Sequence, residues 1–113
     1  MSRLHNGNGK ATYTAMREAE NYGLTASPKT GAVAAVRLHD DTGRYLFSYI
    51  VNRADLLFYV RKPALSAYDG IGPSFSRHFS DARMNPAGEW TLKIRDAATA
   101  RQVVAWLETI QLT

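Results

Sequence analysis

The residues best able to do chemistry in this chain are cations at alternating positions of segments that are typical of β-strands. Alternate residues of a strand point to the same face of a sheet, so positions of one parity gather on one side. The candidate binding residues on that side are Arg37, Leu57, Tyr59, Arg61, Lys93 and Arg95. Because cationic groups beside a tyrosine ring occur in protein interfaces and in nucleic-acid sites alike, this pattern predicts a binding surface on the outer face of a sheet.

Two classes of partner fit this predicted surface. A protein partner, including a second copy of the chain, is favoured because Leu46, Ile50 and Leu57 add an apolar strip to the same side. Nucleic acid, bound through its phosphate backbone, is the alternative, but a net charge of +4 with a pI near 9.6 is modest for such a protein. A further interpretation is a solvated face without a ligand, in which the stems of arginine and lysine cover the apolar strip.

A catalytic alternative uses the glycine-punctuated segment 66–81. Ser66, Tyr68, Asp69 and His78 are of the types that supply a nucleophile and a base in hydrolysis. Serine and aspartate are also common loop residues, so the segment is interpreted first as a loop. A hydrolase is therefore the third hypothesis, behind a small non-enzymatic binding or regulatory module.

Metal, nucleotide and thiol chemistry have little basis in the sequence. The histidines, His5, His39 and His78, have none of the spacings that bring two metal ligands together. Residues 7–10, GNGK, match only the end of a phosphate-binding loop. The absence of cysteine excludes disulfides and thiolate ligands. We therefore expect neither a cofactor nor a metal.

The candidate face depends on consecutive strands whose turns fix their register. Residues 32–39 alternate between apolar and polar, and residues 40–43, DDTG, are typical of a tight reversal in which an aspartate accepts backbone N–H groups. A reversal at this point predicts that Leu38 lies opposite Tyr45.

A second reversal, centred on residues 53–54, adds the third strand. A two-residue loop there places Val51 opposite Leu56 and Phe47 opposite Val60. Both reversals then put the same apolar set on the inner side, namely Ala34, Val36, Leu38, Tyr45, Phe47, Tyr49, Val51, Leu56, Phe58 and Val60. A shift of one residue would mix these side chains with arginines, so the hydrophobic pattern supports the pairing.

The remaining segments are predicted from caps, turn residues and apolar spacing. They are a helix over 12–22, a loop over 25–31, an irregular stretch over 66–74, a short helix from Pro73 that carries Phe75 and Phe79, a turn over 85–88, a strand over 90–95 and a helix over 97–111 capped by Asp96. The order α-β-β-β-α-β-α predicts an α+β fold: an antiparallel sheet of about four strands with helices packed mainly on one face.

Composition sets the broad class. A chain of 113 residues that is 45% hydrophobic and 21% charged suits one domain with its own core, here residues 10–113. Residues 1–9, rich in glycine and asparagine, are expected to form a disordered leader. No apolar run approaches the ~20 residues of a membrane span, and no secretory signal is recognisable, so we expect a cytoplasmic protein without a membrane partner.

Overall fold

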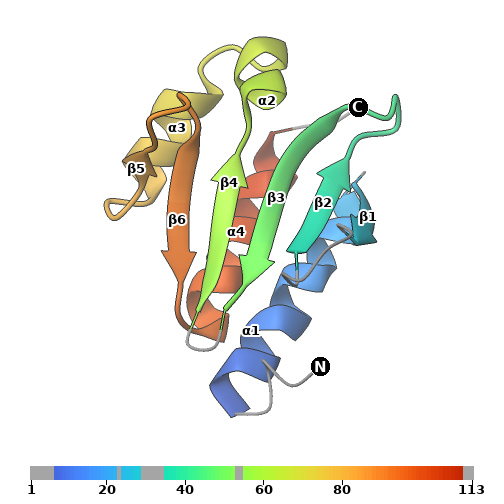
Figure 1. The fold of residues 1–113 in the computed structure, drawn as a ribbon, viewed down its shortest axis with the longest axis vertical. Helices are drawn as coiled ribbons and strands as arrows, with labels where there is room; N and C mark the ends of the chain where they lie inside the picture. The colour runs from blue at the N-terminus through green and yellow to red at the C-terminus, as the bar shows by residue number, and fades with distance from the viewer. Residues whose placement is uncertain (1–6, 23, 29–34, 53–54, 111–113) are drawn as a thin grey trace.

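The computed structural model describes residues 7–22, 24–28, 35–52 and 55–110. Figure 1 shows an antiparallel sheet with helices behind it. In chain order the elements are α1 (Gly7–Met16), a 3-10 helix η2 (Arg17–Tyr22), β1 (Thr25–Pro28), β2 (Ala35–His39), β3 (Tyr45–Val51), β4 (Leu56–Val60), α2 (Lys62–Ala67), α3 (Ile71–His78), β5 (Arg83–Met84), β6 (Trp90–Ile94) and α4 (Ala97–Thr109). The α+β class is confirmed.

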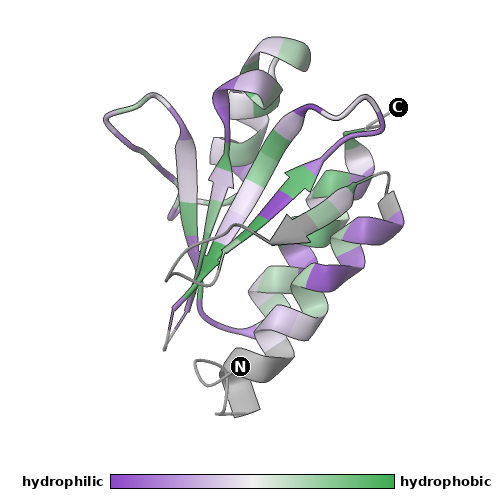
Figure 2. Ribbon diagram, turned by 45° about the vertical axis from the view of Figure 1, so that its right-hand side comes forward, coloured by the Kyte–Doolittle hydropathy of each residue, from purple (hydrophilic) through white to green (hydrophobic). Residues whose placement is uncertain are grey.

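The sheet has two unlike faces. Its strands are ordered β1-β2-β3-β4-β6-β5, and all neighbours are antiparallel. The helices α1 and α4 lie against one face, as the turned view in Figure 2 makes clear. No described helix covers the centre of the other face, which we call the open face. In the described part of the chain, no helix has the length and apolar character needed to span a membrane.

The sheet has six strands, two more than the sequence analysis predicted. The expected loop over 25–31 begins instead as β1, which pairs with β2. Pro28 is tolerated there because β1 is an edge strand, where a missing N–H breaks no ladder bond. The turn over 85–88 is present as predicted, with the Gly88 N–H donating to Asn85 O at 3.0 Å, but it also joins β5 to β6.

Two helical predictions need adjustment. The first helix starts at Gly7, earlier than the expected position 12, so residues 7–9 of the predicted leader are helical; residues 1–6 lie outside the described part. The stretch 66–74, expected to be irregular, contains the end of α2 and the start of α3. Gly70 separates these helices with a φ of 78°, a left-handed conformation that favours glycine.

The second reversal is confirmed, whereas the first is wrong by two residues. Val51 pairs with Leu56 as predicted, but Leu38 pairs with Phe47 rather than with Tyr45. A shift of two preserves which side each residue faces, so the inner set is largely retained among the described residues; Ala34 lies outside them. The register then slips at the start of β3, where His39 pairs with Tyr45 and Leu46 is the extra residue.

This bulge changes the face of two side chains. Tyr45, predicted to be inside, lies on the open face against the guanidinium groups of Arg37 and Arg61. Leu46, predicted to be outside, is fully buried in the core. An extra residue in one strand re-aims the neighbouring side chains, and no feature of the alternating pattern predicted it.

Asp40 organises the turn that precedes the bulge. Its Oδ1 accepts the N–H groups of Thr42 and Arg44 at 3.0 and 2.9 Å and the Thr42 hydroxyl at 2.7 Å. Its Oδ2 accepts Arg44 Nε at 2.7 Å. Burial acts to raise the pKa of Asp40, but these hydrogen bonds outweigh burial and lower it to about 2. The predicted role of an aspartate as the acceptor for backbone N–H groups is confirmed.

The core lies between the inner face of the sheet and the helices. Phe47 stacks on Phe58 with ring centres 5.9 Å apart, and Phe75 of α3 packs against Phe58 and against Trp106 of α4. Phe79 follows Phe75 at 5.1 Å, as the predicted pair requires. The stripe of α4 is buried at Ala100, Val103, Val104 and Leu107. These contacts fix β4 and β6, which carry most of the candidate site.

Candidate binding surface

The six predicted binding residues lie over two adjacent hollows. Arg37, Tyr59 and Arg61 line a shallow hollow of about 260 Å³ over β2, β3 and β4. The same hollow is also lined by Ala35, Tyr45, Ser48, Ile50 and Glu89. Leu57, Lys93 and Arg95 line the second hollow, of about 620 Å³, beside β6. The predicted parity is borne out where β4 pairs with β6, since Leu57 lies opposite Lys93 and Tyr59 opposite Thr91.

Arg61 is held by contacts within the chain. Its Nη1 donates to Tyr45 O at 3.1 Å, and its Nε lies 3.5 Å from a carboxylate oxygen of Glu89. Its guanidinium carbon lies 3.8 Å from the centre of the Tyr45 ring, which is a close cation–π contact. A guanidinium held on three sides has little capacity left for a phosphate, so Arg61 acts mainly as a support for Tyr45.

Arg37 is less fully engaged by contacts within the chain than Arg61. Its guanidinium carbon lies 5.5 Å from the Tyr45 ring, on the same open face. Its Nε is buried and makes no hydrogen bond to any described residue. A buried donor without an acceptor is costly, by about 1–3 kcal/mol. In the described part of the chain Arg37 has no ion pair, whereas Arg61 is paired with Glu89, so Arg37 is the arginine of the first hollow whose charge is not already neutralised.

Tyr59 and Glu89 complete the first hollow. Burial raises the pKa of Tyr59, and the charge of Glu89 and the nearby Tyr45 raise it further, so its hydroxyl stays protonated near neutral pH. The hydroxyl can then donate as well as accept a hydrogen bond. The hollow thus offers both signs of charge, a hydroxyl donor and half-buried apolar surface.

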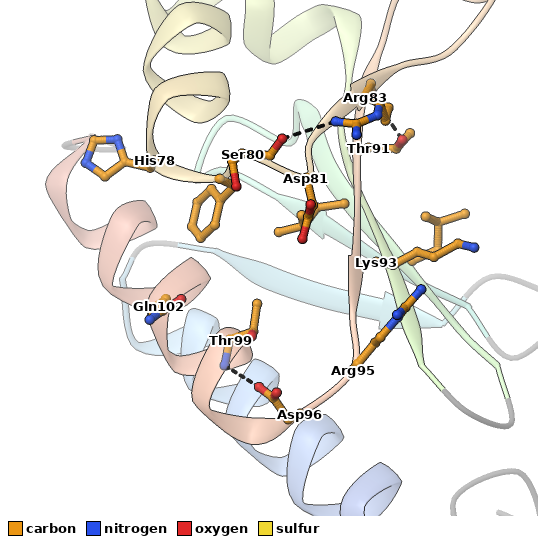
Figure 3. A pocket seen from close by; sticks show the side chains of 13 residues that line it. His78, Ser80, Asp81, Arg83, Thr91, Lys93, Arg95, Asp96, Thr99 and Gln102 are labelled. Carbon is orange, nitrogen blue, oxygen red and sulfur yellow. Dashed lines mark hydrogen bonds between the residues drawn. The ribbon is translucent and has the colours of Figure 1, made fainter.

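The second hollow lies between β6 and the helices α3 and α4 (Figure 3). Lys93 and Arg95 extend from the strand to the same side, away from α4. In the described chain, neither has a carboxylate within ion-pair distance. Arg83, on the same wall, donates to the backbone oxygens of Ser80 and Ala82 at 3.1 and 2.9 Å. Arg83 is exposed as well but is engaged by these hydrogen bonds, so Lys93 and Arg95 are the cations best placed to meet an incoming anion at this hollow.

The candidate catalytic residues of segment 66–81 are not brought together as a nucleophile and a base. His78 is in the last turn of α3, where its Nδ1 lies 2.9 Å from Ser74 O. Ser66 belongs to the preceding helix, α2. Neither Ser66 nor Asp69 forms a hydrogen bond with His78. Within the ranges that the structure describes, no group of three or more histidine, aspartate or glutamate side chains could hold a metal ion.

Tyr45 and Glu89 line the first hollow but were not among the predicted binding residues. Tyr45 was assigned to the core because the bulge at the next residue, Leu46, leaves no mark on the alternating pattern. Glu89 follows the predicted turn over 85–88, and its backbone N–H donates to Asn85 Oδ1 at 2.9 Å, so its place beside Arg61 depends on the hairpin of β5 and β6. The turn residues were the signal that could have located it.

Comparisons of the chain with protein-family models, with curated proteins and with solved structures found no match. The geometry of the open face is therefore the basis on which a function is assigned.

Proposed function

We propose that the chain is a non-enzymatic protein-binding module, and that its open face associates with a second copy of itself. The observation that carries this proposal is the composition of the first hollow. Half-buried tyrosine and aliphatic side chains surround two arginines and a glutamate there, in place of a uniformly basic surface.

The apolar part of the face favours a protein partner. Ile50 and Leu57 are paired across β3 and β4, and both remain only half-buried. Tyr45 and Tyr59 border them on the same face. Tyrosine and arginine at the centre of an apolar patch are typical of the residues that dominate binding energy in protein interfaces. Water removed from this patch would favour association.

The charges favour a symmetric partner over nucleic acid. Glu89 lies on this face, and its carboxylate would repel phosphate. Arg61 is already paired with Glu89. In a two-fold pairing, each surface meets its own copy. Arg37 of one copy could then meet Glu89 of the other, because both side chains line the open hollow. A standard interface of this kind buries about 800 Å² on each partner.

The experiment measures mass by light scattering over a range of protein concentrations, at low and high salt. We expect a dimer that persists at high salt because apolar association is little screened. The variants Ile50→Asp and Leu57→Asp should each weaken the dimer by more than tenfold, since each would bury an unpaired carboxylate in the interface. Both variants should keep the monomer fold, because these side chains are half-exposed in it.

Met84→Asp is the matched control. Met84 is 54% exposed, and it lies opposite Trp90, whose side chain packs on the inner side of the sheet. It should dimerise like the wild type. A wild-type mass of one chain at every concentration contradicts self-association. Retention of a single-stranded oligonucleotide that falls steeply with salt would favour the nucleic-acid alternative instead.

A further inference from the structure

β6 has a sheet edge that is only partly paired. On one side β4 accompanies it from Trp90 to Ile94. On the other side β5 pairs with Trp90 and Thr91 alone, as the short β5 arrow in Figure 1 illustrates. From Leu92 to Ile94, no described strand lies on this second side. The edge is a row of backbone groups available to another strand.

The hydrogen bonds of the neighbouring strands identify which backbone groups face the free edge. The Arg61 N–H donates to Leu46 O at 3.0 Å, which marks odd-numbered residues of β4 as bonded to β3. Because bonding alternates along an antiparallel strand, Phe58 faces β6 and bonds with Leu92 opposite it. The N–H and C=O of Lys93 therefore point away from β4.

The β5 side gives the same result independently. The Asn85 N–H donates to Glu89 O at 2.9 Å, so residue 89 bonds toward the β5 strand. Steps of two from residue 89 give Thr91, which pairs with Arg83 of β5, and then Lys93, which has no such partner among the described strands. Two separate hydrogen bonds thus assign the backbone of Lys93 to the free edge.

Space for another strand exists along this edge. The second hollow, of about 620 Å³, is lined on the sheet side by Leu92 and Lys93. Its far wall consists of residues 78–81 and the first turns of α4, with Thr99 and Gln102 facing inward (Figure 3). An added strand would lie about 4.8 Å from β6. Its backbone would then occupy the hollow in line with β5.

We propose that this edge binds an extended acidic peptide of another protein by strand addition. A residue directly opposite Lys93 would have its side chain on the same face as the Lys93 ammonium. Lys93 and Arg95 are exposed there and form no ion pair with any residue that the structure describes, so an aspartate or glutamate at that position is favoured. The next residues of the peptide would turn toward Leu92 and Phe79, which suits apolar side chains.

A second copy of the chain does not suit this edge. Symmetric antiparallel pairing of two β6 edges about Lys93 would place each ammonium beside its own copy, and like charges directly opposite are destabilising. Edge lysines are a common protection against such self-pairing. Two carboxylates line the second hollow, those of Asp81 and Asp96. Asp96 is committed to the Thr99 N–H at 2.8 Å, and in the described part of the chain neither carboxylate lies within ion-pair distance of Lys93 or Arg95. A carboxylate of the partner can therefore still pair with these cations.

The test uses a fluorescein-labelled heptapeptide in which glutamate alternates with valine, and measures anisotropy together with amide hydrogen exchange. We expect the Lys93 amide to exchange more slowly on saturation. Lys93→Pro removes the edge donor without removing a bond to β4, so it should abolish binding. Lys93→Ala is the matched control: it keeps the N–H and loses the charge, and should weaken binding by about fivefold.

Three results would overturn the proposal: no binding of the peptide at about 1 mM, equal binding of a peptide N-methylated at its central glutamate, or binding that leaves exchange at Lys93 unchanged. Binding of an oligonucleotide in place of the peptide would assign the cations to phosphate. Circular dichroism of each variant checks the fold. The proposal is independent of self-association through the open face, because Lys93→Pro should retain the wild-type mass.

Discussion

The turn at Asp40 should make the stability of this protein depend on pH in a defined window. Its carboxylate accepts four hydrogen bonds from Thr42 and Arg44, and its side chain is 1% exposed. These bonds hold the bulge that turns Tyr45 onto the open face. Asp40→Asn keeps the shape of the side chain and removes its charge, so it isolates the contribution of the carboxylate.

The magnitude follows from the pKa of Asp40. The folded value is about 2, against an ordinary value of 3.8. A depressed pKa means that the charged form is stabilised in the folded state, so the contribution is complete above the unfolded value and is lost as pH falls toward the folded value. Since Arg44 is half-exposed and water screens its charge, we expect the contribution to be about 1–2 kcal/mol near neutral pH.

The assay is urea unfolding of the wild type and Asp40→Asn at several pH values between 6 and 2. The difference in unfolding free energy should be about 1–2 kcal/mol at pH 6 and should shrink between pH 4 and pH 2. Taking the difference between the two proteins cancels the pH-dependent contributions of other carboxylates. One of these is Asp96, because its hydrogen bonds to Thr99 also lower its pKa. The exposed neighbour serves as control, since Asp41→Asn should stay within about 0.5 kcal/mol of the wild type. A difference that is equal at pH 6 and pH 2 would refute the reasoning.

Two further substitutions test the packing that carries the binding surface. Phe58→Ala should lower the unfolding free energy by about 3–5 kcal/mol, because Phe58 is fully buried between Phe47 and Phe75; a near-neutral result by urea denaturation would contradict the assigned inner face. Asp96→Ala should lower the thermal midpoint, because it removes the cap that accepts the Thr99 N–H, and an unchanged midpoint would show that the cap contributes nothing.

Local patterns predicted the elements that carry the surface. The alternation over β2, β3, β4 and β6 located these strands, and the second reversal was correct to the residue. The cap at Asp96 and the buried stripe of α4 followed from side-chain chemistry and spacing. Short-range hydrogen bonds and burial on one face determine these features, so a few adjacent residues contain the necessary information.

The grouping of the candidate site was only partly predictable. The alternation of side chains along the strands correctly placed Lys93 on the same side as Leu57. It did not reveal that Arg61 is paired with Glu89. That contact joins residues 28 positions apart and needs the β5–β6 hairpin beside β4. Likewise, β1 and β5 are short edge strands whose residues resemble loop residues, and only pairing with a neighbour makes them strands.

The sequence alone was enough to predict an α+β fold with an apolar inner face and cations opposite it, because alternation and helical spacing act over a few residues. Contacts between distant strands settle which of these cations are engaged by other described residues. The bulge at Leu46 turned Tyr45 outward, Glu89 came to Arg61 through a hairpin, and β5 ended short of Lys93. Each of these outcomes depends on which distant strands meet and where pairing stops, and the free energy of such contacts depends on the whole packed sheet rather than on any local segment.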